Sequence, residues 1–265
     1  MTRADGVVTI VQARTGSTRL PGKVLFPLGG ATVLERQLER LGQARRTGLL
    51  VVATTTDARD DAIESIARRT GALCYRGDPL DLLDRHYQAA RALGAAHVVK
   101  IPSDCPLIDP AVVDRVIGTY LDSGGFAYCS NLHPATYPDG QDVEVFGFPA
   151  LASAWREAVD RAEREHTTPF FWRRPERFRV GNVTWETGAD CSATHRVVLD
   201  YLEDYAVIRS TYEALAPQGG FGVQDVVDFL DAHPDVAALN AARRGDCWQT
   251  RADREASRAI GVEAA

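Results

Sequence analysis

The chain of 265 residues contains no long hydrophobic run and no basic excess. No stretch approaches the roughly 18 uninterrupted apolar residues that a membrane-spanning helix needs. The opening MTRADGVV has no long apolar segment before a small-residue cleavage site, so we expect a cytoplasmic protein without a secretory signal. A net charge of -6 and a pI near 5.6 exclude the basic surface typical of nucleic-acid-binding domains. Any anionic partner must therefore meet a local basic cluster.

The sequence also lacks closely spaced cysteine pairs. Its five cysteines form no CxxC motif and are odd in number. This pattern favours free or buried thiols in a reducing compartment over a zinc site or a disulfide framework. The positions are Cys74, Cys105, Cys129, Cys191 and Cys247.

Lysine is nearly absent, because only Lys23 and Lys100 are lysines among the 30 basic residues. In a chain so rich in arginine, a lysine indicates a position where a compact ammonium suits the task better than a wide guanidinium. Both lysines lie at or just beyond the end of an expected strand. We therefore examine those two places for function.

Hydrophobic runs alternate with amphipathic helical patterns in the first half of the chain. We expect strands at 6–12, 48–54, 73–76 and 96–101, and helices at 32–45, 57–71, 80–94 and 110–122. Such alternation predicts a mostly parallel sheet with helices on both faces. Beyond residue 122 the alternation ends, and we expect strands at 126–131, 141–148, 177–186 and 194–201 with helices at 149–161, 163–173 and 202–215. We expect two short helices after Gly219. Taken as a whole, the pattern predicts one α/β domain with an α+β elaboration.

The loop QARTGSTRLPGK (12–23) follows the first expected strand and carries Arg14, Arg19 and Lys23 without an acid. Ligands of open α/β sheets bind beyond the carboxyl ends of the strands. Gly16 lets backbone amides approach a ligand, and the hydroxyl of Ser17 adds a donor. Converging donors and positive charge suit a triphosphate, although the loop is not a GxxxxGK[ST] motif. A solvated basic loop is the alternative.

Two acidic residues also follow expected strands. Asp104 in KIPSDCPLID can hold a hard divalent cation through oxygen, as a nucleotide-bound Mg²⁺ requires, or it can simply cap a turn. Asp200 in RVVLDYLEDY could complete a two-carboxylate metal site. Asp204 is better explained as a first-turn helix residue that the helix dipole favours.

The loop 12–23 is similar to the N-terminal signature of the sugar-acid cytidylyltransferases, which reads Pro/Gln-Ala-Arg-x-x-Ser-x-Arg-x-x-x-Lys. That family includes the acylneuraminate and 3-deoxy-manno-octulosonate cytidylyltransferases, and the chain most resembles its spore coat polysaccharide biosynthesis branch, protein F. Further matching stretches are VVATTTDARDD (51–61), YRGDPLDLLDRHYQAA (75–90), KIPSDCPLIDP (100–110), TYPDGQDVEVF (136–146) and EREHTTPFFWRR (163–174).

The resemblance implies a Rossmann-like nucleotidyltransferase fold with a mostly parallel central sheet. Residues 1–215 would form the nucleotidyltransferase domain, 130–175 an elaboration for acceptor binding and dimerisation, and 216–265 a C-terminal helical extension. The implied enzyme is a Mg²⁺-dependent homodimer that condenses CTP with a sugar acid or related hydroxylated acceptor. The products would be a CMP-conjugate and pyrophosphate, for polysaccharide or specialised-metabolite biosynthesis.

The resemblance also assigns site residues by position. Arg14, Lys23 and Asp104 would be catalytic, and Asp104 and Asp200 would hold Mg²⁺. Leu202 replaces the proline of the family's Asp-x-Pro-Glu-Asp motif. The implied nucleotide-binding residues are Gln12, Ala13, Arg14, Gly16, Ser17, Arg19, Lys23, Thr54, Arg76, Gly77 and Ser103, and the implied acceptor-binding residues are Lys100, Asp142, Glu144 and His166.

Alternatives remain for the acceptor residues and for the function. Asp142 and Glu144 alternate with Val143 and Val145, as on the solvated face of an edge strand. His166 could equally be a satisfied structural residue. A nucleotide-sugar-dependent glycosyltransferase is an alternative function, although Ser-Asp-Cys replaces its usual Asp-x-Asp motif. A nucleotide-binding module that has lost catalysis is another.

Overall fold

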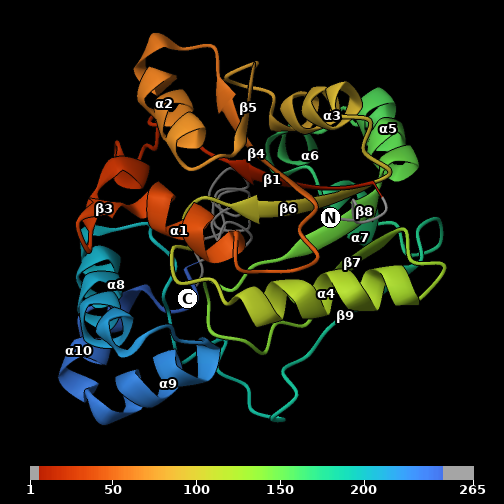
Figure 1. Cartoon of the computed structure of the whole chain (residues 1–265). Helices are drawn as coiled ribbons and strands as arrows, with labels where there is room; N and C mark the ends of the chain where they lie inside the picture. The colour runs from red at the N-terminus through yellow and green to blue at the C-terminus, as the bar shows by residue number, and fades with distance from the viewer. Residues whose placement is uncertain (1–5, 247–265) are drawn as a thin grey trace, which may run out of the picture.

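Seven strands form one sheet in the order β5-β4-β1-β6-β8-β7-β9, as a computed structural model shows for residues 6–246 (Figure 1). Among these strands β8 alone runs antiparallel to its neighbours. A separate two-stranded hairpin joins β2 (Pro27–Leu28) to β3 (Ala31–Thr32). The sheet strands are β1 (Val7–Gln12), β4 (Leu49–Thr55), β5 (Leu73–Gly77), β6 (His97–Pro102), β7 (Tyr128–Ser130), β8 (Glu144–Gly147) and β9 (Val180–Asn182).

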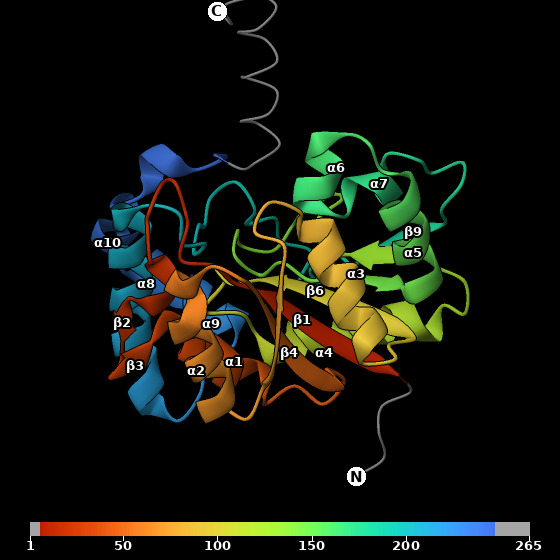
Figure 2. The ribbon, with the colours of Figure 1, turned by 90° about the horizontal axis from the view of Figure 1, so that it is seen from above.

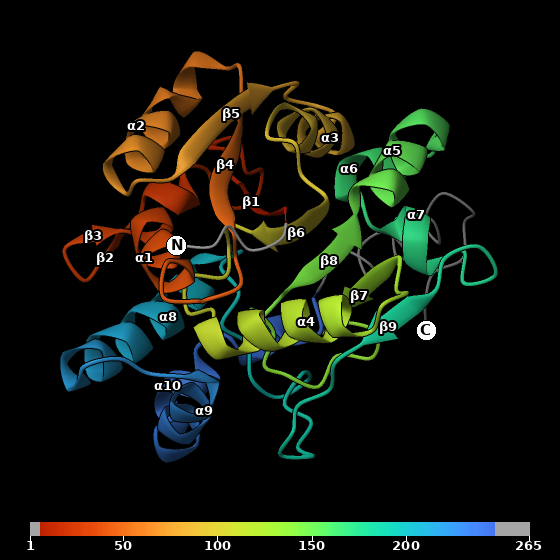
Figure 3. The ribbon, with the colours of Figure 1, turned by 45° about the vertical axis from the view of Figure 1, so that its right-hand side comes forward.

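Helices cover both faces of the sheet (Figures 1 and 3). One face packs against α1 (Val33–Leu41), α2 (Asp61–Arg69) and α4 (Pro110–Asp122). The other packs against α3 (Leu82–Ala92), α5 (Phe148–Glu157) and α7 (Pro169–Trp172), with α6 (Arg161–His166) on α3. A third apolar cluster joins the β2–β3 hairpin to α8 (Leu202–Leu215), α9 (Val223–Ala232) and α10 (Pro234–Ala238).

Strand β1 shows why the sequence folds into this layered arrangement. Successive side chains of a strand point to opposite faces. Val7 and Val11 accordingly join the cluster under α1, α2 and α4, whereas Val8 and Ile10 join the cluster under α3 and α5. All four are at most 2% exposed. The continuous hydrophobic run therefore predicts a strand that is covered on both sides.

The predicted α/β class and most predicted elements are confirmed, with five corrections. The predicted helix 163–173 is two helices, α6 and α7, because Thr167 between them has a φ of 68° and ends α6. The predicted strand 194–201 is wrong, because its amides bond to loops: Val197 N donates to Asp139 O and Leu199 N to Asp104 O. The predicted strand 177–186 shrinks to β9. The predicted helix from residue 57 begins only at residue 61, after a 3-10 turn over Ala58–Asp60. The β2–β3 hairpin, with two residues in each strand, was not predicted.

The described cysteines are free thiols, as the sequence predicts. They are Cys74, Cys105, Cys129 and Cys191, while Cys247 lies outside the described residues. Burial raises the pKa of Cys105 well above its ordinary value, so this thiol stays protonated. No helix in the described part of the chain is both long and apolar enough to cross a bilayer.

Candidate active site

The candidate site lies at the carboxyl ends of β1 and β6. These strands pair in parallel, so that Gln12 lies beside Pro102, and β4 flanks β1 on the other side. The strand order reverses direction between β1 and β6, and ligands of open α/β folds bind at such switch points. Figure 2 shows the loop after β1 (red) beside α8 and α10. The two strands therefore bring residues 12–23 and 103–104 to one edge of the sheet.

The loop 12–23 is held by its neighbours in a fixed course. Thr15 donates to Asp60 Oδ1 from both its amide and its hydroxyl, at 2.8 and 2.6 Å. Leu20 is buried against α8. A Cβ added at Gly16 would meet no atom within 4 Å, so this glycine leaves open space above the loop. Arg14 is exposed, and its Nη1 donates to the carbonyl of Pro79 at 3.2 Å. Ala13 is buried, and the Ser17 hydroxyl accepts from the loop's own backbone.

Lys23 joins two carboxylates that are distant in sequence. Its Nζ lies 2.9 Å from Asp104 Oδ2, 2.9 Å from Asp200 Oδ1 and 2.6 Å from the carbonyl oxygen of Leu199. The side chain is buried. Burial alone would lower its pKa, but Asp104 and Asp200 together raise the pKa above its ordinary value. Lys23 is therefore a buried ammonium that links the segment carrying Asp104 to the segment carrying Asp200.

The Asp200 carboxyl has a lowered pKa. Burial would raise its pKa, but Lys23 and Arg19 outweigh burial and lower the pKa to about 2. The Arg19 guanidinium donates to the same carboxylate oxygen, Oδ1, as Lys23 does. Asp200 is therefore ionised at neutral pH.

The donor set fits a hard divalent cation. Asp104 and Asp200 already share one cation, the Lys23 ammonium, and the Leu199 carbonyl also contacts this ammonium. The two carboxylates and the Leu199 carbonyl offer oxygen atoms, which are the ligands that Mg²⁺ prefers. Proteins usually hold Mg²⁺ by one or two carboxylates together with substrate phosphates. Residues 6–246 contain no group of three or more acidic, histidine or cysteine side chains arranged as a metal site. A cation here would therefore need the phosphates of its substrate as further ligands.

The implied nucleoside residues do not all face the site. Arg76 donates to the carbonyls of Thr55 and Asp57 and pairs with Asp61 and Glu64. Its guanidinium is thus occupied in joining β5 to α2. Thr54 is fully buried at the end of β4, and Ser103 is buried directly after β6.

Arg85 on α3 is a further candidate residue, which is not among those predicted from the sequence. It is 3% exposed, and its Nε and Nη1 have no hydrogen-bond partner within residues 6–246. Burial first, and Arg14 second, lower its pKa to about 10, so it remains charged at neutral pH. A Cβ added at Gly77 would lie 2.8 Å from Arg85 Cγ, so the glycine allows this close approach.

Unpartnered buried donors require an explanation, and a ligand with acceptor oxygens supplies one. The side-chain oxygen of Gln12 is likewise buried without a partner in the described residues. One signal for Arg85 was available in the sequence. A cation near the first turn of a helix opposes the helix dipole, which is unusual unless an anion is nearby.

The acceptor residues form one buried pair and two separate positions. Lys100 and Glu144 are cross-strand neighbours on β6 and β8, and their side chains form a buried ion pair. Glu144 also accepts a hydrogen bond from the Tyr128 hydroxyl at 2.7 Å. A solvated strand face is therefore wrong for Glu144. His166 is half-buried at the end of α6.

Asp142 is half-buried, and the pKa of its carboxyl is raised. Burial first, and the nearby charge of Asp139 second, raise its pKa from 3.8 to about 8. Asp104 and Glu144 add further repulsion, whereas Lys100 opposes it. Asp142 therefore lies in an acidic surrounding that favours a bound cation or a hydroxyl donor.

Comparison with known proteins decides the family. A sequence model described as cytidylyltransferase matches residues 8–215. The chain belongs to the cytidylyltransferase family. It is 32% identical over 238 residues to an uncharacterized protein of Methanocaldococcus jannaschii, covering 89% of this chain and 94% of that protein. It is 28% identical over 250 residues to the spore coat polysaccharide biosynthesis protein SpsF of Bacillus subtilis, covering 90% and 99%.

Further matches support the same family. The 3-deoxy-manno-octulosonate cytidylyltransferase of Trichlorobacter lovleyi is 34% identical over 119 residues, which cover 45% of this chain and 46% of that enzyme. A solved cytidylyltransferase structure from Leptospira borgpetersenii superposes with a TM-score of 0.82 at 31% identity, covering 88% of this chain and 96% of the other. The resemblance and the nucleotidyltransferase fold inferred from the sequence are thus confirmed. This cytidylyltransferase is a CTP-dependent enzyme, which sets aside the glycosyltransferase and inactive-module alternatives.

Proposed function

We propose that this cytidylyltransferase uses Mg²⁺ to join CTP to a sugar acid or a related hydroxylated acceptor. The products are a CMP-conjugate and pyrophosphate. The observation that carries the proposal is the position of Lys23, whose ammonium joins Asp104 and Asp200 at the switch point of the sheet. Two carboxylates that converge on one cation beside a basic loop are what a metal-bound triphosphate needs.

The reaction is a substitution at the α-phosphorus of CTP. A hydroxyl oxygen of the acceptor forms the new bond to this phosphorus, the bond to the β-phosphate bridging oxygen breaks, and the hydroxyl proton is released to solvent. The protein contributes mainly by positioning the reactants and stabilising charge. Arg14 and Lys23 stabilise the leaving pyrophosphate. The Arg85 guanidinium, whose Nε and Nη1 have no partner within residues 6–246, donates to the nucleotide.

Asp104 and Asp200 are the residues that would hold Mg²⁺. A bound ion would neutralise charge on the α-phosphate during the attack. Arg19 also holds the Asp200 carboxylate through an ion pair with Oδ1, while the Asp200 amide donates to Asp204 Oδ2. Gln12, Ala13, Gly16, Ser17, Thr54, Gly77 and Ser103 complete the proposed nucleotide site, in which Arg76 supports the frame through its contacts with α2.

The proposed acceptor site uses Asp142 and His166 for direct contacts. The buried Lys100–Glu144 pair acts as its floor, because both side chains already satisfy one another. We further propose that residues 130–175 support acceptor binding and a homodimer, that 216–265 extend the domain 1–215, and that the enzyme works in the cytoplasm. The name of the Bacillus subtilis relative supports a role in polysaccharide biosynthesis.

The direct test is pyrophosphate release by the purified chain. Each of CTP, UTP, ATP and GTP is supplied with Mg²⁺ and a panel of sugar acids, neutral sugars, phosphosugars and phosphonates. We expect release only with CTP and a hydroxylated acid. Release with a neutral sugar or a phosphosugar would overturn the acceptor class. Full activity in a metal-free buffer containing a chelator would overturn the role of Mg²⁺.

A further inference from the structure

The segment that follows α8 holds the residues around Asp200 through several polar side chains. Asp246 accepts a hydrogen bond from the Tyr201 hydroxyl at 2.7 Å, and its carbonyl accepts from Arg196 Nη1 at 3.3 Å. Arg243 donates to Glu203 at 3.0 Å. The family match ends at residue 215, so these contacts come from outside the matched region.

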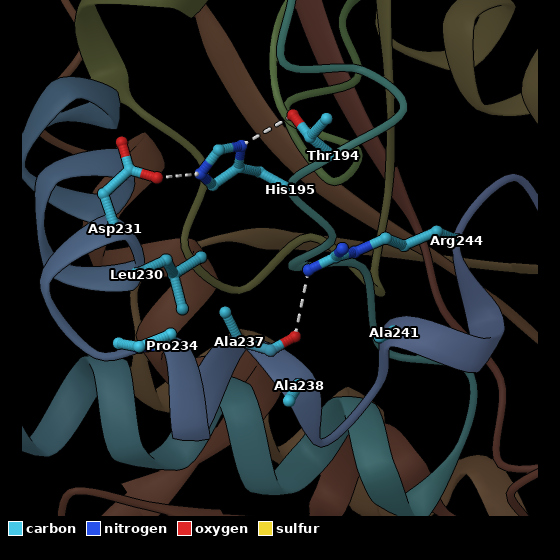
Figure 4. Close-up of a pocket in the computed structure, with 9 residues that line it drawn as sticks. All are labelled: Thr194, His195, Leu230, Asp231, Pro234, Ala237, Ala238, Ala241 and Arg244. Atoms are coloured by element: carbon cyan, nitrogen blue, oxygen red, sulfur yellow. Dashed lines mark hydrogen bonds and ion pairs between the residues drawn. The ribbon is translucent and has the colours of Figure 1, made fainter.

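A pocket of about 360 Å³ is lined by residues 194–195 together with residues of α9 and α10 (Figure 4). On one side of it His195 Nε2 lies 3.1 Å from Asp231 Oδ1, and Nδ1 lies 2.9 Å from the Thr194 hydroxyl. On another side Arg244 donates to the carbonyl of Ala237. Val197 and Leu199, directly before Asp200, are buried in the third apolar cluster. Polar contacts add to this packing in fixing the course of the chain around Asp200.

Asn240 makes the most deeply buried of these contacts. Its side chain is 2% exposed. Nδ2 donates to the carbonyl oxygen of Arg196 at 3.0 Å and to Asp204 Oδ1 at 2.9 Å. Asn240 thus uses both of its amide protons, one on a residue that precedes Asp200 in the sequence and one on a residue that follows it.

Asp204 connects Asn240 to the backbone of Asp200. Its Oδ2 accepts from the amides of Asp200 and Tyr201, each at 3.0 Å. Its Oδ1 accepts from Arg196 Nε at 2.9 Å. Asp204 is fully buried, so each of these hydrogen bonds restricts its orientation. Asn240 is therefore one hydrogen bond away from a carboxylate that fixes the backbone of Asp200.

We propose that Asn240 is a positioning residue for Asp200, and that the segment after α8 is part of the catalytic apparatus through it. The inference rests on the proposed role of Asp200 as a metal ligand. Residues that orient metal ligands change metal affinity when they are altered, even without touching the metal. Loss of the Asn240 amide removes a donor from the Arg196 carbonyl and leaves Asp204 Oδ1 with the hydrogen bond from Arg196 Nε.

The test compares Asn240→Leu, Asn240→Asp and a matched control in the same segment, Gln224→Ala. Gln224 is exposed and donates to Asp228 on its own helix. Mn²⁺ affinity in the presence of CTP is measured by calorimetry, together with kcat and KM for CTP. We expect Asn240→Leu to weaken Mn²⁺ binding and lower kcat by about tenfold each, with KM for CTP changed less than twofold. The control is expected to match the wild type.

Asn240→Asp separates a donor role from a packing role. Aspartate is closer to asparagine in shape than leucine is, but its carboxylate faces the Asp204 carboxylate and the Arg196 carbonyl. We expect it to weaken Mn²⁺ binding at least as much as Asn240→Leu. A milder effect of aspartate, or wild-type Mn²⁺ affinity in either variant, overturns the proposal. Should Asn240→Leu fail to fold, Asn240→Ser makes the same comparison.

Asp200→Asn shows which of the two proposals fails. Wild-type Mn²⁺ affinity in Asp200→Asn would overturn the metal site itself. Weakened binding in Asp200→Asn with unchanged binding in both Asn240 variants would overturn the positioning role alone.

Discussion

Lys23 holds the site together as a single buried ammonium between Asp104 and Asp200. Lys23→Ala leaves the Asp200 carboxylate buried with fewer counter-charges and removes a donor from the proposed leaving group. We expect kcat to fall by roughly 100-fold, as for the loss of one charge-stabilising donor. Pyrophosphate release under saturating CTP measures the effect. Arg68→Ala removes an exposed arginine on α2 and is the control. Wild-type turnover in folded Lys23→Ala would contradict the assignment.

Arg85 carries two buried donors without partners in the described residues. Such a group destabilises the protein and is retained where it binds a ligand. Arg85→Met keeps a similar length and removes the charge, so we expect the Kd for CTP to rise about tenfold or more while the free energy of unfolding stays equal or increases. Calorimetry with CTP and urea unfolding measure the two quantities. An unchanged Kd, or a clear loss of stability, would show that Arg85 serves packing alone.

Asp142 makes stability depend on pH. Its folded-state pKa is raised from 3.8 to about 8 by burial and by Asp139. A raised carboxyl pKa contributes stability that is fully present below the unfolded pKa and is lost as the pH rises through the folded pKa. The side chain introduced in Asp142→Asn stays neutral and does not lose this stability. We therefore expect the free energy of unfolding of the variant, relative to that of the wild type, to be higher at pH 8 than at pH 5. Urea unfolding without divalent cations measures this. Equal differences at both pH values would contradict it.

Helix α8 begins at Leu202, where the family pattern has proline. Tyr201 before it is extended, with φ -133° and ψ 166°, and such a backbone accepts a following proline. Proline is also favoured at the first helical position, where its missing amide proton is not needed. We therefore expect Leu202→Pro to raise the free energy of unfolding by about 0.4–1 kcal/mol, by restricting the unfolded chain. Urea unfolding measures the change. A loss of stability would mean that the exposed leucine makes a contact of its own.

The elements that the sequence predicts best are those whose burial pattern is complete. Strand β1 is buried on both faces, so its hydrophobic run is unambiguous. Residues 197–199 are also hydrophobic, yet form no strand, because the amides of Val197 and Leu199 bond to the loops that hold Asp139 and Asp104. Hydrophobicity reports that a segment is buried. It does not report which backbone groups its amides meet.

At the scale of the molecule, the site depends on contacts that are remote in sequence. The loop 12–23 and Asp104 were predictable because both follow strands and match a known signature. Asp200 was predicted in the same way, but Arg196 and Asn240 are connected to it through hydrogen bonds to Asp204, which leave no periodic pattern in the sequence. Arg76 shows the converse, because it matches the signature but its guanidinium faces α2. Only the tertiary structure distinguishes a signature residue that faces the site from one, such as Arg76, that does not.

The segment after α8 should also be needed for folding. Val226 and Leu230 of α9 are buried against α8 and the hairpin, while Val223 and Val227 join the cluster under α1 and α4. Each fully buried side chain contributes roughly 1.5–3 kcal/mol, so the loss of four approaches the whole stability of a typical domain, about 5–15 kcal/mol. A chain ending at Gln218 still contains the family-matched region. We nevertheless expect it to aggregate or to lack a cooperative thermal transition, as gel filtration and circular dichroism measure, whereas a monomer that unfolds cooperatively would show that residues 1–218 fold alone.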